Sequence, residues 1–307
     1  MTKSVFRGNI AALILLLNMV FYDLYAGPIL ALLPKIPLVL SIASDFLVFI
    51  PPAVIYFLIS NKGKGFLCDT FNIKEMDVIN ILLIVVISIF IQPFLMSVSA
   101  VTSLFFPNAA SEYLESMADL PAFSTLIITS LLPAFFEELF FRGIVFSNFR
   151  KLSPVKACVL CGLLFGMAHL NFQQFSYAFL MGCVFCYFVY KTGSIFSSIL
   201  SHFLINGSQT ILSALSIKMT AAANPQALEA AQSTQATIHD LIPFFYLTLL
   251  SLIPLAFAFY FFNLHNSKNN GFESESNENA VYSLKQNIIN WPLVLIIIIF
   301  LYYSFSA

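Results

Sequence analysis

The sequence predicts an all-α fold, a polytopic transmembrane helix bundle of about 8-9 spans with a cytoplasmic N-terminus. Of its 307 residues, 59% are hydrophobic and only 9% are charged, whereas about a quarter of the residues in soluble domains are charged. The 35 Phe side chains are too many to be buried in one water-soluble core. Most apolar side chains must therefore face lipid or other helices.

The apolar stretches predict where the spanning helices lie, because a helix needs about 20 mostly apolar residues to cross a bilayer. The first stretch follows Lys3 and Arg7 as the core of a signal peptide would, but it continues past Asp23 without a convincing cleavage site. We expect it to remain as an anchor. The predicted spans, nine with eight as the alternative count, are 9–33, 36–59, 78–106, 122–149, 157–170, 172–190, 194–217, 241–263 and 291–305.

The basic residues predict the orientation of the chain, because cytoplasmic loops carry an excess of Lys and Arg. If all nine stretches cross and the N-terminus is cytoplasmic, Lys35 and Lys218 are the basic residues that fall outside, and Arg142 lies within the membrane. The loop at 107–121 then lies outside with three acidic residues and no basic one. The cytoplasmic set is Lys3, Arg7, Lys62, Lys64, Lys74, Arg150, Lys151, Lys156, Lys191, Lys268 and Lys285.

Several function classes are disfavoured. A net charge of −1 and a pI near 6.4 leave no basic field for nucleic acid. Cys158 and Cys161 form a C-x-x-C pair, as do Cys183 and Cys186. In a soluble loop such pairs would suggest zinc or redox chemistry, but here they lie within apolar spans without close basic neighbours, so we interpret them as reduced packing residues.

The fourth span carries ionisable groups where apolar ones are expected. Glu137, Glu138 and Arg142 lie within an aromatic run, and three unpaired charges would oppose insertion by roughly 8–10 kcal/mol. Glu138 and Arg142 are four residues apart and share a helix face, so they are placed to form an ion pair. Glu137 lies about 100° around the helix from Glu138 and is left free for another role.

Two later spans each carry a histidine. His169 follows Gly162 and Gly166 on one helical stripe, so the small residues that allow close helix approach lie on its side. That histidine should face a neighbouring helix. In the seventh span His202 and Asn206 share a face.

Three of these polar side chains have similar predicted depths in the membrane. Glu137, His169 and His202 each lie about 16–20 Å along their helices from a basic residue at the cytoplasmic end. They are therefore placed to form one layer across three spans. The three basic markers are Arg150, Lys156 and Lys191.

The motifs E-E-x-x-x-R, F-x-x-x-H and H-x-x-x-N, in this order on separate spans, resemble the CPBP family of intramembrane peptidases. These are the CAAX-processing and bacteriocin-processing enzymes, also called the Abi family. The resemblance divides the chain into N-terminal transmembrane helices at 1–121, a CPBP-like core at 122–217, and a polar loop with C-terminal helices at 218–307. Outside the core the chain is similar in hydrophobicity only.

The resemblance implies hydrolysis of a peptide bond in a membrane-associated or lipidated peptide or protein. Glu137 would be the general base that activates water, with His169 beside it. His202 and Asn206 would hold the developing oxyanion. The implied partners are the substrate and the lipid bilayer, in a multi-pass protein that we place in the cytoplasmic membrane of a bacterium.

Two mechanisms remain open on the sequence. Glu138 and Arg142 would support the fourth span in either one. Glu137, His169 and His202 could instead supply three ligands to zinc, with water in the fourth position. No H-E-x-x-H motif is present, so the site with two histidines on one helix is excluded as a pattern.

Other functions remain alternatives. The Gly-x-Ser-Gly motif of rhomboid-type peptidases is missing, and Tyr22-Asp23 has no Gly-x-Gly-Asp partner for an aspartyl dyad. An ion-coupled transporter would use the same buried charges as a path, although no inverted repeat is visible. A non-catalytic immunity or scaffold protein would keep the motifs for structure. Asp23 and Asp45, in the first two spans, have no assigned role.

Overall fold

Helices form the regular secondary structure of the computed structural model, which describes residues 2–60, 70–117, 119–223, 237–268 and 288–306. The predicted all-α fold is therefore confirmed for these residues. The helices are α1 (Thr2–Val20), α2 (Tyr22–Ala31), α3 (Pro37–Ser60), α5 (Val78–Phe90), α6 (Gln92–Ser103), α7 (Ala109–Ser116), α8 (Ala122–Leu126), η1 (Ile127–Leu131), α9 (Leu132–Glu138), η2 (Leu139–Val145), α10 (Pro154–Met167), α11 (Phe172–Thr192), α12 (Phe196–Ala223), α14 (Ile238–His265) and α15 (Trp291–Ser306).

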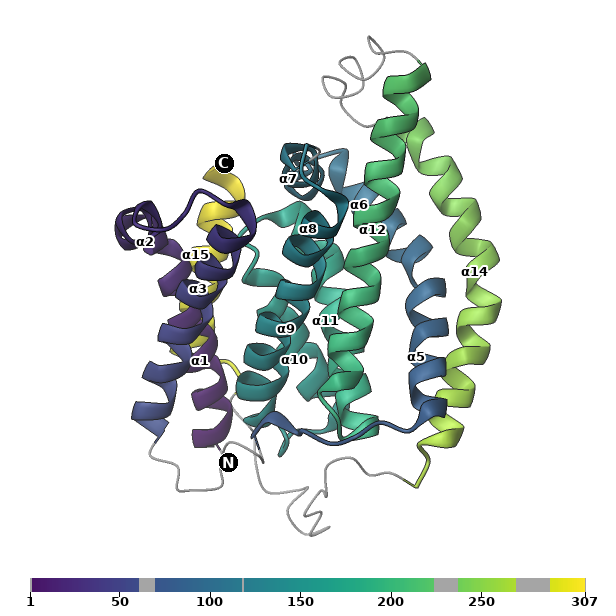
Figure 1. The fold of residues 1–307 in the computed structure, drawn as a ribbon. Helices are drawn as coiled ribbons and strands as arrows, with labels where there is room; N and C mark the ends of the chain where they lie inside the picture. Colours follow the sequence, from purple (N-terminus) through teal and green to yellow (C-terminus); the bar gives the residue numbers. More distant parts are fainter. Residues whose placement is uncertain (1, 61–69, 118, 224–236, 269–287, 307) are drawn as a thin grey trace.

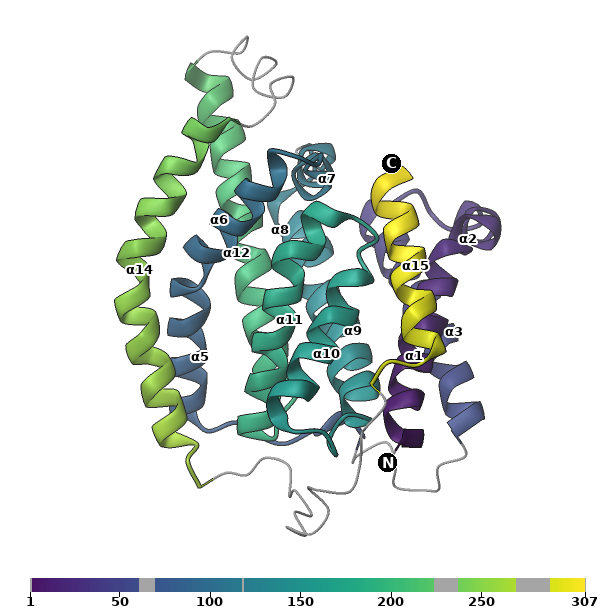
Figure 2. The same ribbon diagram turned by 180° about the vertical axis from the view of Figure 1, so that it is seen from behind.

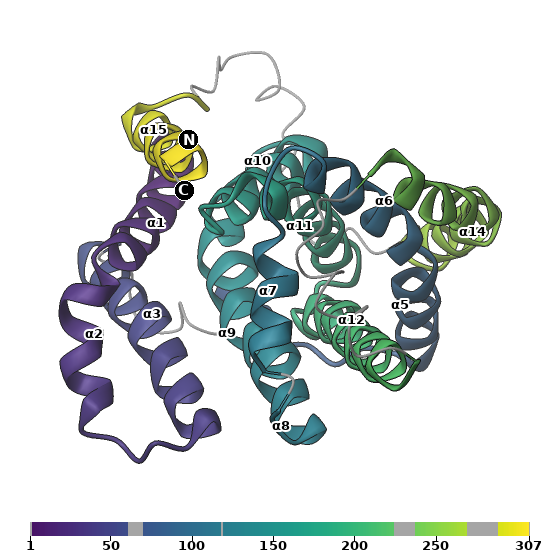
Figure 3. The same ribbon diagram turned by 90° about the horizontal axis from the view of Figure 1, so that it is seen from above.

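The helices stand side by side in three groups (Figure 1, Figure 3). On one side α1 packs against α3 and α15, so that the first and last helices of the described chain lie side by side, as Figure 2 also shows. The middle group holds α9 to α12, with α10 and α11 packed closely together. On the far side α14 covers α5 and α6. The middle group therefore lies between two flanking layers.

Six helical segments of the described chain are long and apolar enough to cross a membrane. Two further apolar helices, α10 and α15, are shorter, with 14 and 16 residues. α12 has 28 residues but carries His202, Asn206 and several Ser and Thr residues, and it does not meet the same apolar criterion. The six segments are Lys3–Val20, Pro37–Ser60, Val78–Ser103, Ala122–Val145, Phe172–Thr192 and Leu241–His265.

The first predicted span, 9–33, is not one helix. It is divided at Phe21, which takes φ −95° and ψ 6° between α1 and α2. Figures 1 and 3 show α2 turned across the direction of α1. The Tyr25 hydroxyl bonds Asn18 Oδ1 at 2.9 Å and the Tyr22 hydroxyl bonds Ser44 Oγ at 2.6 Å. These polar contacts fix the turn, which hydrophobicity alone does not indicate.

The glycine stripe of the fifth predicted span packs against α11, as its spacing predicts. A Cβ added at Gly182 of α11 would lie 2.8 Å from Gly162 Cα, and one added at Gly166 would lie 2.9 Å from the Phe175 ring. The helix ends earlier than 170, however, because α10 stops at Met167 and Leu170 takes φ 53°. His169 therefore lies in the turn between α10 and α11.

Candidate active site

The two glutamates occupy the end of a short α-helix between two π-helical stretches. η1 precedes α9 and η2 follows it, so the helix is wound more widely on both sides of the site. Such π-helical turns are rare and are frequently found at functional sites. Glu137 and Glu138 are the last residues of α9, and Arg142 lies in η2. The two glutamates thus end an α-helical turn that π-helical stretches flank on both sides.

Glu138 is the centre of a buried polar network. Its Oε1 accepts from Arg142 Nη1 at 3.0 Å and lies 2.8 Å from His202 Nδ1 of α12. Glu138 and Arg142 have no exposed surface, and His202 is 2% exposed. Arg142 Nη2 also donates to the carbonyl of Gly182 at 3.2 Å. The network therefore joins the α9–η2 segment to both α11 and α12.

Aromatic rings enclose the cation of this network. The Arg142 guanidinium carbon lies 4.3 Å from the centroid of the Phe165 ring and 5.1 Å from that of Phe185. Such cation–π contacts stabilise a desolvated guanidinium by about 1–2 kcal/mol. Phe185 also stacks on the His202 ring, with centroids 5.1 Å apart. The buried arginine is thus held by one carboxylate, one carbonyl and two rings.

Phe165 lies between the two histidines. Its ring centroid is 5.2 Å from that of His169 and 6.0 Å from that of His202. His169 Nδ1 lies 3.0 Å from the carbonyl oxygen of Phe165. The phenylalanine of the F-x-x-x-H motif therefore orients its own histidine and spaces it from the second one. The two histidines thus both contact the same phenylalanine ring.

Asn206 reaches the first π-helical stretch. Its Nδ2 donates to the carbonyl of Thr129 at 3.4 Å, and the Thr129 hydroxyl bonds Thr210 Oγ1 at 2.7 Å. Asn206 itself is half-buried. It lies one turn from His202 on α12, and the pair therefore presents two polar side chains on one face toward the η1–α9 segment.

Glu137 differs from its neighbour. It is half-buried, and within the described residues it takes part in none of the hydrogen bonds or ion pairs that hold Glu138. Its charge interacts electrostatically with Asp45 of α3 and with Tyr177 of α11. Phe46 follows Asp45 in the chain, and its ring packs edge-on against that of Phe136 with centroids 5.2 Å apart. Glu137 therefore lies within electrostatic range of titratable side chains on α3 and α11.

Comparison with protein families identifies the segment that holds this network. Residues 119–208 match the Rce1-like family model, described as type II CAAX prenyl endopeptidase. All seven motif residues lie inside the Rce1-like segment, and the resemblance to the CPBP family is confirmed. No curated protein and no solved structure matches the chain.

The contacts of the Rce1-like segment refine the expected site. Sequence spacing correctly pairs Glu138 with Arg142, but it does not reveal that His202 bonds the same carboxylate. Asp45 lies outside the Rce1-like segment and had no assigned role. Its signal in the sequence was an acidic group within an apolar span. The structure places it within electrostatic reach of Glu137.

The arrangement of the described side chains does not support the zinc alternative. Among the described residues no group of three His, Cys, Asp or Glu side chains is arranged to hold a metal ion. Glu137, His169 and His202 do not form such a group. The ligand set proposed for zinc from the sequence is therefore not supported.

Proposed function

We propose that this protein is an intramembrane endopeptidase that hydrolyses a peptide bond of a membrane-associated or lipidated protein with a water activated by Glu137. The proposal rests on the difference in burial and contacts between the two adjacent glutamates. Glu138 is fully buried and bonded to Arg142 and His202, whereas Glu137 is half-buried and outside that network. The match of residues 119–208 to the Rce1-like family supports the peptidase class.

In the proposed reaction Glu137 removes a proton from water as the water oxygen attacks the carbonyl carbon of the scissile bond. His169 lies beside the attacking water. The tetrahedral intermediate carries its negative charge on the former carbonyl oxygen, where His202 as an imidazolium, with Nδ1–H on Glu138, donates from Nε2–H and Asn206 donates from Nδ2–H. The proton held by Glu137 then passes to the leaving amine, and the C–N bond breaks. Glu138 directs Nε2 of His202 toward the substrate by engaging Nδ1.

The polar groups near Glu137 suit a base that needs water. Glu138 Oε2 is buried without a hydrogen-bond partner among the described residues, and buried polar atoms are nearly always hydrogen-bonded to protein or water. Asp45 and Tyr177 add two further polar side chains near the carboxylate. We infer that water occupies this region and supplies the nucleophile.

The substitution Glu137→Gln tests the base directly. We expect it to lower the cleavage of a farnesylated peptide ending in a CAAX sequence by about 10²–10⁴-fold in proteoliposomes, because the amide cannot accept the proton. Since Glu137 lies outside the Glu138 network, the thermal unfolding temperature should stay near that of the wild type. Product masses measured by mass spectrometry give the rate and the cleaved bond.

Glu112→Gln is the matched control, because it removes an exposed acid of α7 outside the site. Unchanged cleavage by Glu137→Gln would contradict the assignment of the base. Activity that a chelator removes and zinc restores would contradict a reaction that depends on the glutamate and water alone. A wild-type chain that cleaves no lipidated peptide would favour the transporter or scaffold alternatives.

A further inference from the structure

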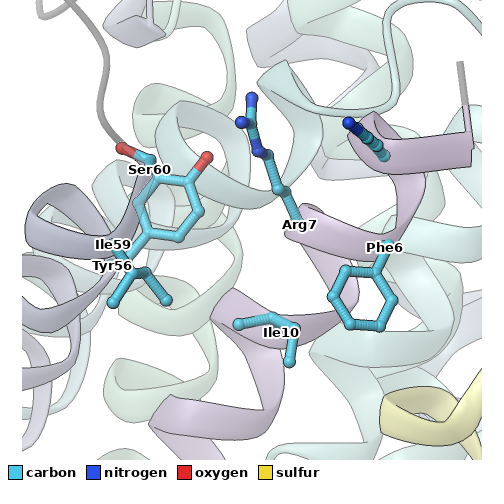
Figure 4. A pocket seen from close by; sticks show the side chains of 7 residues that line it. Phe6, Arg7, Ile10, Tyr56, Ile59 and Ser60 are labelled. Atoms are coloured by element: carbon cyan, nitrogen blue, oxygen red, sulfur yellow. The ribbon is translucent and has the colours of Figure 1, made fainter.

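A cavity of about 340 Å³ lies between the beginning of α1 and the end of α3, away from the glutamates. Its walls come from two antiparallel helices that are both candidate membrane spans. Figure 4 shows the side chains that line it. They are Lys3, Phe6, Arg7 and Ile10 of α1, and Tyr56, Ile59 and Ser60 of α3.

The cavity is polar at one end and apolar at the other. In Figure 4 the guanidinium of Arg7 and the hydroxyls of Tyr56 and Ser60 gather toward one end. The side chains of Phe6 and Ile10 lie toward the opposite end. This separation matches a molecule that has a polar head and an apolar tail.

The polar end is cationic. Lys3 and Arg7 are four residues apart on α1 and thus share a helix face, and both are exposed. In the described part of the chain, the ion pairs are those of Glu138 and Asp77, so neither cation is neutralised by a carboxylate there. The seven lining residues include no acidic group. The cavity therefore attracts an anion and offers no partner for a second positive charge.

Neighbouring residues place the polar end at the membrane surface. The Trp291 ring, 59% exposed at the start of α15, packs edge-on against Phe6 with centroids 6.0 Å apart. Asn9 Nδ2 bonds Asn290 Oδ1 at 3.0 Å, which fixes the start of α15 at this level. Tryptophan is enriched at the interface between lipid and water. An interfacial position of Trp291 would set Lys3 and Arg7 at headgroup depth, with the apolar end of the cavity toward the hydrocarbon.

We propose that this cavity binds an anionic glycerophospholipid, with its phosphate between Lys3 and Arg7 and its acyl chains along Phe6, Ile10 and Ile59. Basic pockets between transmembrane helices bind anionic headgroups in this way. A zwitterionic lipid binds less well, because its ammonium group has no acidic partner in the lining. The proposal concerns a second site and does not rest on the proposed peptidase function.

The walls of the lipid site are joined to the segment that follows the glutamates. The Tyr56 hydroxyl and Asn148 are bonded to each other, with Asn148 Nδ2 at 2.7 Å. Ser4 Oγ donates to the carbonyl of Asn148, and Gly8 lies directly against the ring of Phe149. A lipid that binds only the assembled cavity therefore stabilises the packing of α1 and α3 against this segment, by mass action.

Native mass spectrometry of the purified chain tests the site. We expect the wild type to retain one phosphatidylglycerol in preference to phosphatidylcholine, and that lipid to raise the thermal unfolding temperature. The double variant Lys3→Gln/Arg7→Gln should retain roughly tenfold less phosphatidylglycerol, because two charge contacts are lost. Ile59→Trp keeps both cations but fills the cavity, and it should also lose the lipid.

The double variant Lys151→Gln/Lys156→Gln is the control, since it removes the same charge from the exposed start of α10. It should retain phosphatidylglycerol as the wild type does. An equal loss in this control would overturn the proposal in favour of diffuse attraction. Equal retention of phosphatidylcholine, or retention by Ile59→Trp, would also overturn it. Displacement of the lipid by millimolar inorganic phosphate would show a free-anion site instead.

Discussion

Two adjacent carboxylates meet different surroundings because neighbouring side chains on a helix point about 100° apart. Glu138 contacts the fully buried Arg142 and His202, while Glu137 is half-buried and lies within electrostatic range of Asp45. A buried ion carries a desolvation cost of several kcal/mol, which a partner must offset. Glu138 has two such partners, and this leaves its neighbour available for chemistry.

The substitution Glu138→Ala should destabilise the protein more than any change at Glu137. It leaves the guanidinium of Arg142 buried without its carboxylate, which costs about 3–5 kcal/mol in comparable buried pairs. The measurement is unfolding in detergent followed by circular dichroism. Glu138→Ala/Arg142→Met removes both charges and should recover part of the lost stability. A double variant less stable than Glu138→Ala alone would contradict this account.

Part of this site can be predicted from the sequence, and the rest cannot, for a physical reason. Glu138 and Arg142 lie on one helix, so helical geometry alone relates them. His202 is 64 positions from Glu138, and its choice between two adjacent glutamates depends on how α12 packs against α9. Composition and spacing carry no information on that choice. The same holds for Thr129, whose carbonyl binds Asn206 without any signal in the motif.

At the scale of the helices, polar contacts and small residues determine bends and close helix contacts, which hydrophobicity does not predict. Apolar residues continue through Phe21, so a hydropathy argument joins α1 and α2, although the chain turns there. The π-helical stretches beside α9 have no sequence signal that we recognise. The α10–α11 contact is different, because the glycine stripe predicts close approach. Helix existence is therefore well predicted, and bends and boundaries less so.

The substitution Gly182→Ala should separate α10 from α11. Its new Cβ would lie 2.8 Å from Gly162 Cα, and a backbone atom cannot move aside cheaply. We expect a loss of about 1–3 kcal/mol, typical of overpacking. Cleavage should weaken too, since the Gly182 carbonyl accepts from Arg142. The measurements are the unfolding temperature and the cleavage rate.

Gly27→Ala is the control for this experiment. A Cβ at Gly27 would meet nothing within 4 Å, and alanine is favoured over glycine inside a helix by about 1 kcal/mol. Its stability should therefore stay equal or rise. If Gly182→Ala behaves like Gly27→Ala, the two helices tolerate a wider separation than their packing indicates.

At the scale of the whole molecule, loop contacts gather several basic residues at one end. Asn72 accepts from Arg150 Nη2 at 2.8 Å through its side chain and from the Ile195 backbone N–H at 3.1 Å through its carbonyl. The Ser194 hydroxyl donates to the carbonyl of Lys74. These contacts join the ends of η2 and α11. We propose that this end is cytoplasmic, which the excess of basic residues favours.

Some of the basic residues that predict the orientation of the chain lie outside the part that the structure describes. Lys62, Lys64 and Lys285 lie outside the described residues. The number of spans also depends on whether the short or polar helices cross the membrane. Six are long and apolar, whereas α10, α12 and α15 are either short or polar. Nine spans therefore stay a proposal, and the orientation of the Ala122–Val145 helix is the part most directly open to experiment.

Single cysteines placed at the two ends of that helix test its orientation. In a variant whose native cysteines are replaced by alanine, we introduce Ser116→Cys in the acidic segment or Ser153→Cys before α10, both exposed positions. A cytoplasmic N-terminus predicts that a membrane-impermeant maleimide labels Ser116→Cys in intact cells, and Ser153→Cys only after the cells are permeabilised. The reverse pattern would invert the orientation. Labelling of both in intact cells would mean that the helix with Glu137 does not cross the membrane, and the buried site would need another account.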